Sequence, residues 1–243
     1  MNNIKIPGNY QYQALNFGLA PQRFWHANKL LLLETTGKFK PTDIILDAGC
    51  GSGNIVIALS GRVKKAVGID SNKEALNFAK ERASKLKIKN IALFNKNLQS
   101  LPFKNDYFDK IILFEVVEHL SIKEYKKILA EAYRVLKPNG QFFLTTPNQK
   151  SLWPVIQWFL DTLKLVPSLN DQHVLKFTPK QIGNIISENG FQIKQVGTLN
   201  HFSPFVSLLS WKLAEIIFHF EVIHLKKFGP IIWIMATKKQ DLL

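Results

Sequence analysis

Residues 47–53 read Asp-Ala-Gly-Cys-Gly-Ser-Gly, with glycine at every second position from Gly49 onward. Glycine lets the backbone turn tightly and approach a ligand closely. The residues after Gly53 are apolar and predicted to be helical, and the free N–H groups of a helix N-terminus point at such a turn. The pattern therefore predicts a ligand-binding turn, although purely structural turns also contain glycine.

A second acid, Asp70, ends an apolar stretch 17 residues after Gly53. A carboxylate at this place can accept hydrogen bonds from both hydroxyls of a ribose. Capping of a helix that begins at Ser71 is a compatible role. The glycine spacing differs from the Gly-x-Gly-x-x-Gly that gives a dinucleotide room for its pyrophosphate, which argues against hydride transfer with NAD.

Glu115, Glu118 and His119 follow another apolar stretch at spacings i, i+3 and i+4. If a helix begins here, the three side chains share one face. They could then bind a divalent cation such as Mg2+, which lowers the pKa of a hydroxyl, with His173 as a fourth ligand. His119 or His173 could also serve as a general base. In the alternative, Glu115 orients a cofactor while the other two cap and pack the next helix.

Short apolar stretches alternate with helical patterns, and this order must position the side chains named above. Apolar strands between helices are typical of a parallel sheet covered on both faces, and right-handed crossovers make it doubly wound. The predicted strands are 43–47, 66–70, 91–94, 108–114, 141–146, 190–196 and 231–236, and the predicted helices are 23–36, 54–59, 71–86, 122–136 and 204–225. The sequence thus predicts an α/β, Rossmann-like, doubly wound sheet of seven mostly parallel strands.

A length of 243 residues suits a single domain, 1–243, with helical cap insertions. We divide it into an N-terminal lid and helix (1–40), a cofactor-binding core (41–147) and two insertions on the substrate or membrane side (148–180 and 202–228). Aromatic side chains in the lid and the first insertion suit a planar or hydrophobic acceptor, or belong to an ordinary core: Tyr10, Tyr12, Phe17, Phe24, Trp25, Trp153, Trp158 and Phe159.

The chain is basic, with a net charge of +14. Such a field attracts the anions of nucleic acid or of membrane headgroups, although a lysine-rich, solvated surface explains it equally well. The single cysteine, Cys50, and the lack of an apolar leader predict a cytoplasmic protein. The apolar stretch 202–225 is interrupted by Lys212, Glu215, His219 and Glu221, so we expect core or peripheral membrane contact there, and no membrane span.

Four motifs, in this order along the chain, resemble those of the class I methyltransferases that use S-adenosylmethionine (SAM). Residues 45–53 are similar to the glycine motif and 68–71 to the ribose motif. Residues 97–109 are similar to the adenine loop and the start of the fourth strand, and 136–141 to a Leu-Lys-Pro-Gly-Gly turn. The resemblance implies SAM as cofactor, beside Asp47, Gly49, Cys50, Gly51, Gly53, Asp70, Ser71, Asn97, Leu98, Phe114 and Glu115.

The sequence departs from the family's pattern at two positions. Asn97 stands where the family usually has an aspartate that contacts the adenine amine. An asparagine oxygen can still accept a hydrogen bond from that amine, but the contact is weakened. Asn139 replaces the usual first glycine of its turn, and asparagine also tolerates positive φ.

Residues 115–120, Glu-Val-Val-Glu-His-Leu, followed by Thr-Thr-Pro-Asn at 145–148, resemble two narrower families. These are the quinone-ring O-methyltransferases of ubiquinone synthesis and the small-RNA 3′-terminal 2′-O-methyltransferases, in which the Glu-x-x-Glu-His motif is implicated in magnesium- or manganese-assisted catalysis. We expect in-line SN2 transfer of the SAM methyl group to a small, hydrophobic or aromatic acceptor of the quinone or lipid kind. An RNA methyltransferase and a noncatalytic SAM-binding protein are the alternatives.

Overall fold

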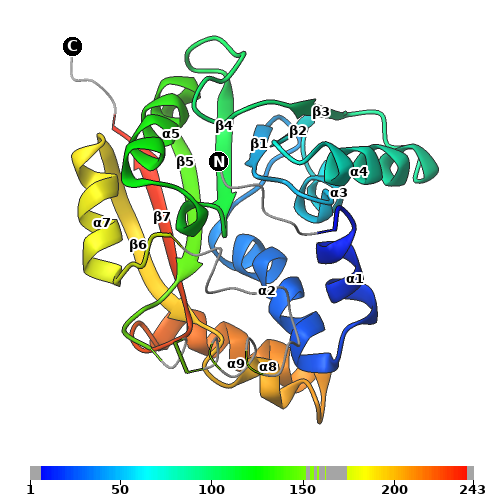
Figure 1. Cartoon of the computed structure of the whole chain (residues 1–243), viewed down its shortest axis with the longest axis vertical. Helices are drawn as coiled ribbons and strands as arrows, with labels where there is room; N and C mark the ends of the chain where they lie inside the picture. Colours follow the sequence, from blue (N-terminus) through cyan, green and yellow to red (C-terminus); the bar gives the residue numbers. More distant parts are fainter. Residues whose placement is uncertain (1–6, 152–153, 156–157, 159–161, 163–173, 240–243) are drawn as a thin grey trace.

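A seven-stranded sheet forms the centre of the computed structural model, which describes residues 7–151, 154–155, 158, 162 and 174–239. The strand order is β3-β2-β1-β4-β5-β7-β6 (Figure 1). The strands are β1 (Ile44–Ala48), β2 (Lys65–Asp70), β3 (Ile91–Asn95), β4 (Phe108–Phe114), β5 (Leu136–Pro147), β6 (Phe191–Leu199) and β7 (Ile231–Lys238). β7 runs antiparallel to both of its neighbours, and the pairs among β1 to β5 are parallel. The predicted doubly wound, mostly parallel sheet is confirmed.

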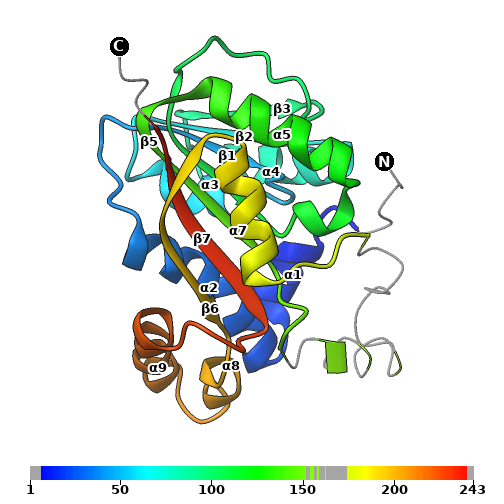
Figure 2. The same cartoon turned by 90° about the vertical axis from the view of Figure 1, so that its left-hand side faces the viewer.

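Helices cover both faces of the sheet, because the strands are apolar on both sides. One buried cluster joins the sheet to α5 and α7, and a second joins its other face to α2, α3 and α9 (Figures 1 and 2). α1 packs beside α2, and α8 beside α9. The helices are α1 (Tyr10–Phe17), α2 (Ala20–Thr36), α3 (Asn54–Ser60), α4 (Lys73–Lys85), the 3-10 turn η1 (Val117–His119), α5 (Ile122–Val135), α7 (Pro179–Glu188), α8 (Ser203–Val206) and α9 (Trp211–His224).

The single helix predicted over 204–225 is in fact two helices, α8 and α9. Ser210 has an extended backbone, and its side-chain oxygen accepts a hydrogen bond from the backbone N–H of Leu213 at the start of α9. This capping fixes a new helix start and separates α9 from α8. None of the helices in the described part of the chain is long and apolar enough to cross a membrane.

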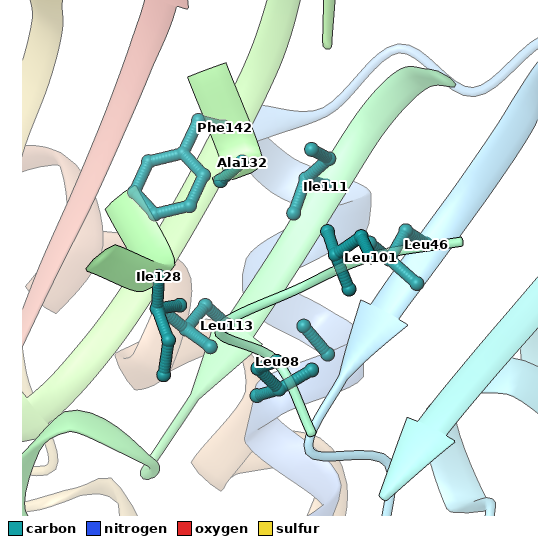
Figure 3. A pocket seen from close by; sticks show the side chains of 9 residues that line it. Leu46, Leu98, Leu101, Ile111, Leu113, Ile128, Ala132 and Phe142 are labelled. Atoms are coloured by element: carbon teal, nitrogen blue, oxygen red, sulfur yellow. The ribbon is translucent and has the colours of Figure 1, made fainter. Parts of the chain in front are cut away.

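A small gap remains in the core between the sheet and α5 (Figure 3). Every side chain around it is apolar and belongs to the first cluster. A site for a polar ligand needs a few convergent polar groups to fix its orientation, and this gap offers none from its side chains. We therefore assign this gap to core packing; its lining residues are Leu46, Ala48, Leu98, Leu101, Ile111, Leu113, Ile128, Ala132 and Phe142.

Candidate cofactor and methyl-transfer site

The glycine loop between β1 and α3 has the left-handed backbone that glycine favours. The φ angles of Gly49, Gly51 and Gly53 are 83°, 48° and 77°. A Cβ atom on Gly49 would lie 2.4 Å from a methyl carbon of Val116, so a side chain does not fit there. The backbone N–H of Gly49 donates to the carbonyl of Ile69 over 2.7 Å, which holds the loop against the end of β2. The loop is therefore a fixed backbone cradle at the carboxyl edge of the parallel strands.

Two carboxylates flank this loop. Asp70 accepts hydrogen bonds from the backbone N–H groups of Gly51 and Asn72, each over 2.7 Å, and burial raises its pKa. Asp47 is 3% exposed, and its Oδ2 atom has no hydrogen-bond partner among the described residues. Burial, followed by the charge of Asp70, raises the pKa of Asp47 to about 7. An unpartnered buried carboxylate oxygen calls for a cationic donor in this position.

The helix N-cap next to Asp70 differs from the one predicted. Asn72, one residue after Ser71, is the N-cap of α4, and its side chain accepts from the backbone N–H of Ala75. Ser71 is exposed before the first turn. The side chain of Asp70 is thus not the cap and remains directed to the glycine loop through Gly51.

α1 lies on the glycine loop and contributes a residue that the sequence analysis did not select. The Gln11 side-chain oxygen accepts from the backbone N–H of Ser52 over 3.4 Å, and its backbone carbonyl accepts from the Asn54 side chain over 3.0 Å. The guanidinium of Arg82 lies 4.3 Å from the ring centroid of Tyr12 and donates to the carbonyl of Ser52. These contacts hold α1 against the glycine loop, and the N-terminal lid stays a prediction.

Beside the glycine loop lies a pocket to which α2 contributes two side chains, Lys29 and His26. Lys29 forms an ion pair of 2.5 Å with Glu115, which follows β4, and both side chains are largely buried. Burial, followed by the charge of Lys29, lowers the pKa of His26 to about 4, so this histidine is neutral at pH 7. The pocket brings together residues from α1, α2, β1, α3 and β4, namely Gln11, His26, Lys29, Asp47, Gly49, Cys50, Asn54, Ile55 and Phe114. No local pattern signalled Lys29, since 86 positions separate it from Glu115.

The prediction that Glu115, Glu118 and His119 share one helical face is wrong. Glu115 has φ of 53°, in the left-handed region, and α5 begins only at Ile122. Glu118 points inward and accepts from the Thr146 hydroxyl over 3.2 Å. Among the residues that the structure describes, no three His, Cys, Asp or Glu side chains gather in a way that could hold a metal ion.

The remaining predicted site residues have different surroundings. Leu98 and Phe114 are buried, and burial raises the pKa of the Cys50 thiol, which therefore stays protonated. The Asn97 side chain is exposed, and its oxygen accepts from the backbone N–H of Gln99 over 2.8 Å. His119 ends η1 and is half-buried. His173, Trp153 and Phe159 lie outside the described residues.

The chain belongs to the methyltransferase-domain family, whose model matches residues 39–194. Family and fold together make it a class I SAM-dependent methyltransferase, as the four motifs predicted. It is 32% identical to the 2-phytyl-1,4-naphtoquinone methyltransferase of Nostoc sp., over 63% of this chain and 68% of that protein. It is 26% identical to a demethylmenaquinone methyltransferase of Bacillus cereus, over 65% of this chain and 67% of that protein.

A solved structure supports the fold independently of these relatives. The crystal structure of the YcgJ protein from Bacillus subtilis matches with a TM-score of 0.60, covering 89% of this chain and 99% of that chain at 24% identity. At this identity the likeness bears on the fold alone. It extends the match beyond residue 194, where the family model ends, and so includes part of the region that follows α7.

Proposed function

We propose that this enzyme transfers the methyl group of SAM to an apolar aromatic ring of the quinone class. The observation that carries the proposal is the match to two relatives named for naphthoquinone and demethylmenaquinone methylation, each over about two-thirds of its length. Phe114 and His26 line the pocket, and Tyr10 of α1 packs edge to face on His26; these rings support a planar acceptor. No specific contact favours the RNA alternative.

The residues around the glycine loop fit SAM, and we propose a role for each carboxylate. The open Oδ2 atom of Asp47 is suited to the ammonium of the methionine part, because charge-assisted hydrogen bonds are strong where water is excluded. The carboxylate of Asp70 accepts from the backbone N–H groups of Gly51 and Asn72, and we propose that it also accepts from the ribose hydroxyls. Leu98 and Asn97 remain the predicted neighbours of the adenine. The bound SAM would supply a methyl group already activated by its sulfonium.

At the methyl end, we propose that Lys29 balances the charge of Glu115, a role that a divalent cation would otherwise fill. Lys29 pairs with the carboxylate of Glu115, whereas the carboxylate of Glu118 points toward Thr146. The enzyme then accelerates transfer mainly by placing the acceptor in line with the sulfonium, which removes much of the entropic cost. Glu115 and His119 remain the candidate groups for orienting the acceptor and removing its proton, and His173 the third.

The test is a methyl-transfer assay with a defined acceptor. Purified enzyme is incubated with SAM and a 2-substituted naphthoquinol, and mass spectrometry follows the acceptor and S-adenosylhomocysteine. We expect an acceptor that gains one methyl group in step with the S-adenosylhomocysteine formed. A parallel reaction with small RNA serves as the competing substrate. Methylation of RNA with an unchanged quinol would overturn the proposal, as would binding of SAM without transfer to any ring acceptor.

A further inference from the structure

The segment that contains α8 and α9 carries an unusual number of exposed apolar side chains. Seventeen large apolar residues in the described part of the chain are exposed, and nine of them lie within residues 202–228, which contain α8 and α9. Their exposed fractions run from 44% to 86%. We call this set the α8–α9 surface; its members are Phe202, Phe205, Leu208, Leu209, Leu213, Ile216, Phe220, Ile223 and Phe228.

α9 is apolar on both sides, unlike an ordinary surface helix. Its inner side packs on the sheet and on α2, where the rings of Phe218 and Phe24 contact each other edge to face. Its outer side presents Leu213, Ile216, Phe220 and Ile223, which recur at spacings of three and four residues and form one outward stripe. A helix that covers a core normally has polar residues opposite its apolar face. The outer stripe therefore needs an apolar partner.

The lysines around this surface are exposed, whereas Glu215 is half-buried and Glu221 is buried. Lys212, Lys226 and Lys227 are exposed. Glu215 accepts from the Trp211 indole N–H over 2.9 Å. Glu221 is buried and accepts from the backbone N–H groups at the start of α8. The outward face thus combines apolar side chains with lysines, which is complementary to an anionic lipid headgroup layer over hydrocarbon.

The α8–α9 surface is at the same end of the sheet as the methyl-transfer site. β6 runs parallel to β5, since both pair antiparallel to β7, and the ends of β5 and β6 meet at Ile231. α8 and α9 follow β6 at this edge, as Figure 1 shows below the arrowheads of β4 and β5. α8 and α9 also pack on α2, which carries Lys29. A surface that touches a bilayer here would bring the pocket close to apolar acceptors dissolved in it.

We infer that the α8–α9 surface docks on an anionic bilayer, with its apolar side chains at the headgroup–acyl boundary and its lysines among the headgroups. With 14 residues, α9 is too short to span the roughly 20-residue hydrocarbon core, so it lies along the surface. This inference rests on the proposed function, because it states where the enzyme would encounter an apolar acceptor, namely at the surface of a bilayer. The binding itself is measurable without any acceptor.

Vesicle co-sedimentation tests the inference on the full chain. The vesicles are phosphatidylcholine alone or phosphatidylcholine with phosphatidylglycerol. Leu209→Asp removes the most exposed apolar side chain, with Leu86→Asp at the end of α4 as its control. Lys226→Glu with Lys227→Glu reverses the local charge. Its control is Lys126→Glu with Lys127→Glu, an exposed lysine pair on α5. Thermal unfolding verifies that each variant is folded.

We expect the unmodified chain to pellet with anionic vesicles and far less with neutral ones. The two α8–α9 variants should lose about tenfold in binding, while both controls keep it. If the control variants lost as much vesicle binding as the α8–α9 variants, net charge alone would explain the effect, and the inference would be overturned. Unchanged binding, or a dimer in light scattering that Leu209→Asp dissociates, would also overturn it. Methylation of a short-chain, water-soluble naphthoquinol without vesicles should be unchanged in all four variants, so failure of the acceptor proposal stays distinguishable.

Discussion

The two halves of the pocket are held together in different ways. On the cofactor side, residues 47–72 contact one another through hydrogen bonds donated by backbone N–H groups. Gly49 donates to the carbonyl of Ile69, and Gly51 donates to the side chain of Asp70. On the methyl side, side chains far apart in sequence meet, as Lys29 does with Glu115. From this comparison we expect SAM binding to depend on a local motif, and acceptor binding to depend on how α2 packs. Substitutions should therefore affect the two halves differently.

The largest expected effect is on the cofactor half. Asp70→Ala removes two backbone anchors of the loop and the proposed ribose acceptor. Because hydrogen bonds to a charged group contribute about 1.5–3 kcal/mol each, we expect SAM affinity to fall about a hundredfold or more. Isothermal calorimetry measures this change, with Glu81→Gln on the exposed face of α4 as the control. Unchanged affinity would remove Asp70 from the site.

Asp47→Asn should reduce SAM affinity by about tenfold and abolish its pH dependence. The buried Asp47 has a pKa of about 7, so it is increasingly protonated as pH falls through 7 and cannot pair with an ammonium. Affinity of the unmodified enzyme should therefore rise between about pH 6 and about pH 8 and then level off. Calorimetry across this range provides the measurement, and an identical profile in the asparagine variant would contradict the assignment.

On the methyl side, Lys29→Met should remove the ion-pair partner of Glu115, whose carboxylate is largely buried. We expect a loss of about 2 kcal/mol in stability and about a tenfold lower kcat. The double variant Lys29→Met with Glu115→Gln should recover stability but not kcat. Thermal unfolding and steady-state rates separate the two effects, with the exposed Lys38→Met as control. Additive losses in the double variant would show that the pair is not coupled.

The smallest effect on activity is expected at Glu118. Burial raises its pKa to about 7, so the folded state binds its proton more tightly than the unfolded state, and stability falls as pH rises from its ordinary 4.5 through 7. Glu118→Gln should remove this loss and raise stability by about 2 kcal/mol above pH 7. Glu131→Gln is the opposite control, because Arg134 lowers the pKa of Glu131.

The same variant also tests the metal hypothesis. With Glu118 turned toward Thr146, we expect Glu118→Gln to keep methyl transfer and EDTA to leave its rate unchanged. The metal hypothesis would be supported if methyl transfer were lost in Glu118→Gln and if EDTA abolished the rate of the unmodified enzyme until Mg2+ was added. The candidate ligands would then again be Glu115, Glu118 and His119. Rates at saturating SAM make the comparison direct.

The cofactor half and the sheet could be predicted from sequence because their signals are local. Apolar stretches that alternate with helices predict a parallel sheet. The glycine loop is predicted from the seven residues 47–53 alone. Gln11, His26 and Lys29 could not be found in this way, since only the packing of α1 and α2 brings them to the loop. The helix start predicted at residue 122 is confirmed, and Ser121 with Glu124 forms a capping box there. The same pattern argues against the helix that the sequence analysis considered over Glu115 to His119.

β7 has a consequence for how the chain is made. It pairs with β5 on one side and β6 on the other, yet it is synthesised after both. Until Lys238 has left the ribosome, β5 keeps an open edge and β6 has no strand beside it in the described sheet. Before β7 is available, the apolar α8–α9 surface has already been synthesised. During that interval, the exposed apolar side chains of the growing chain are most accessible to a chaperone or a nearby bilayer.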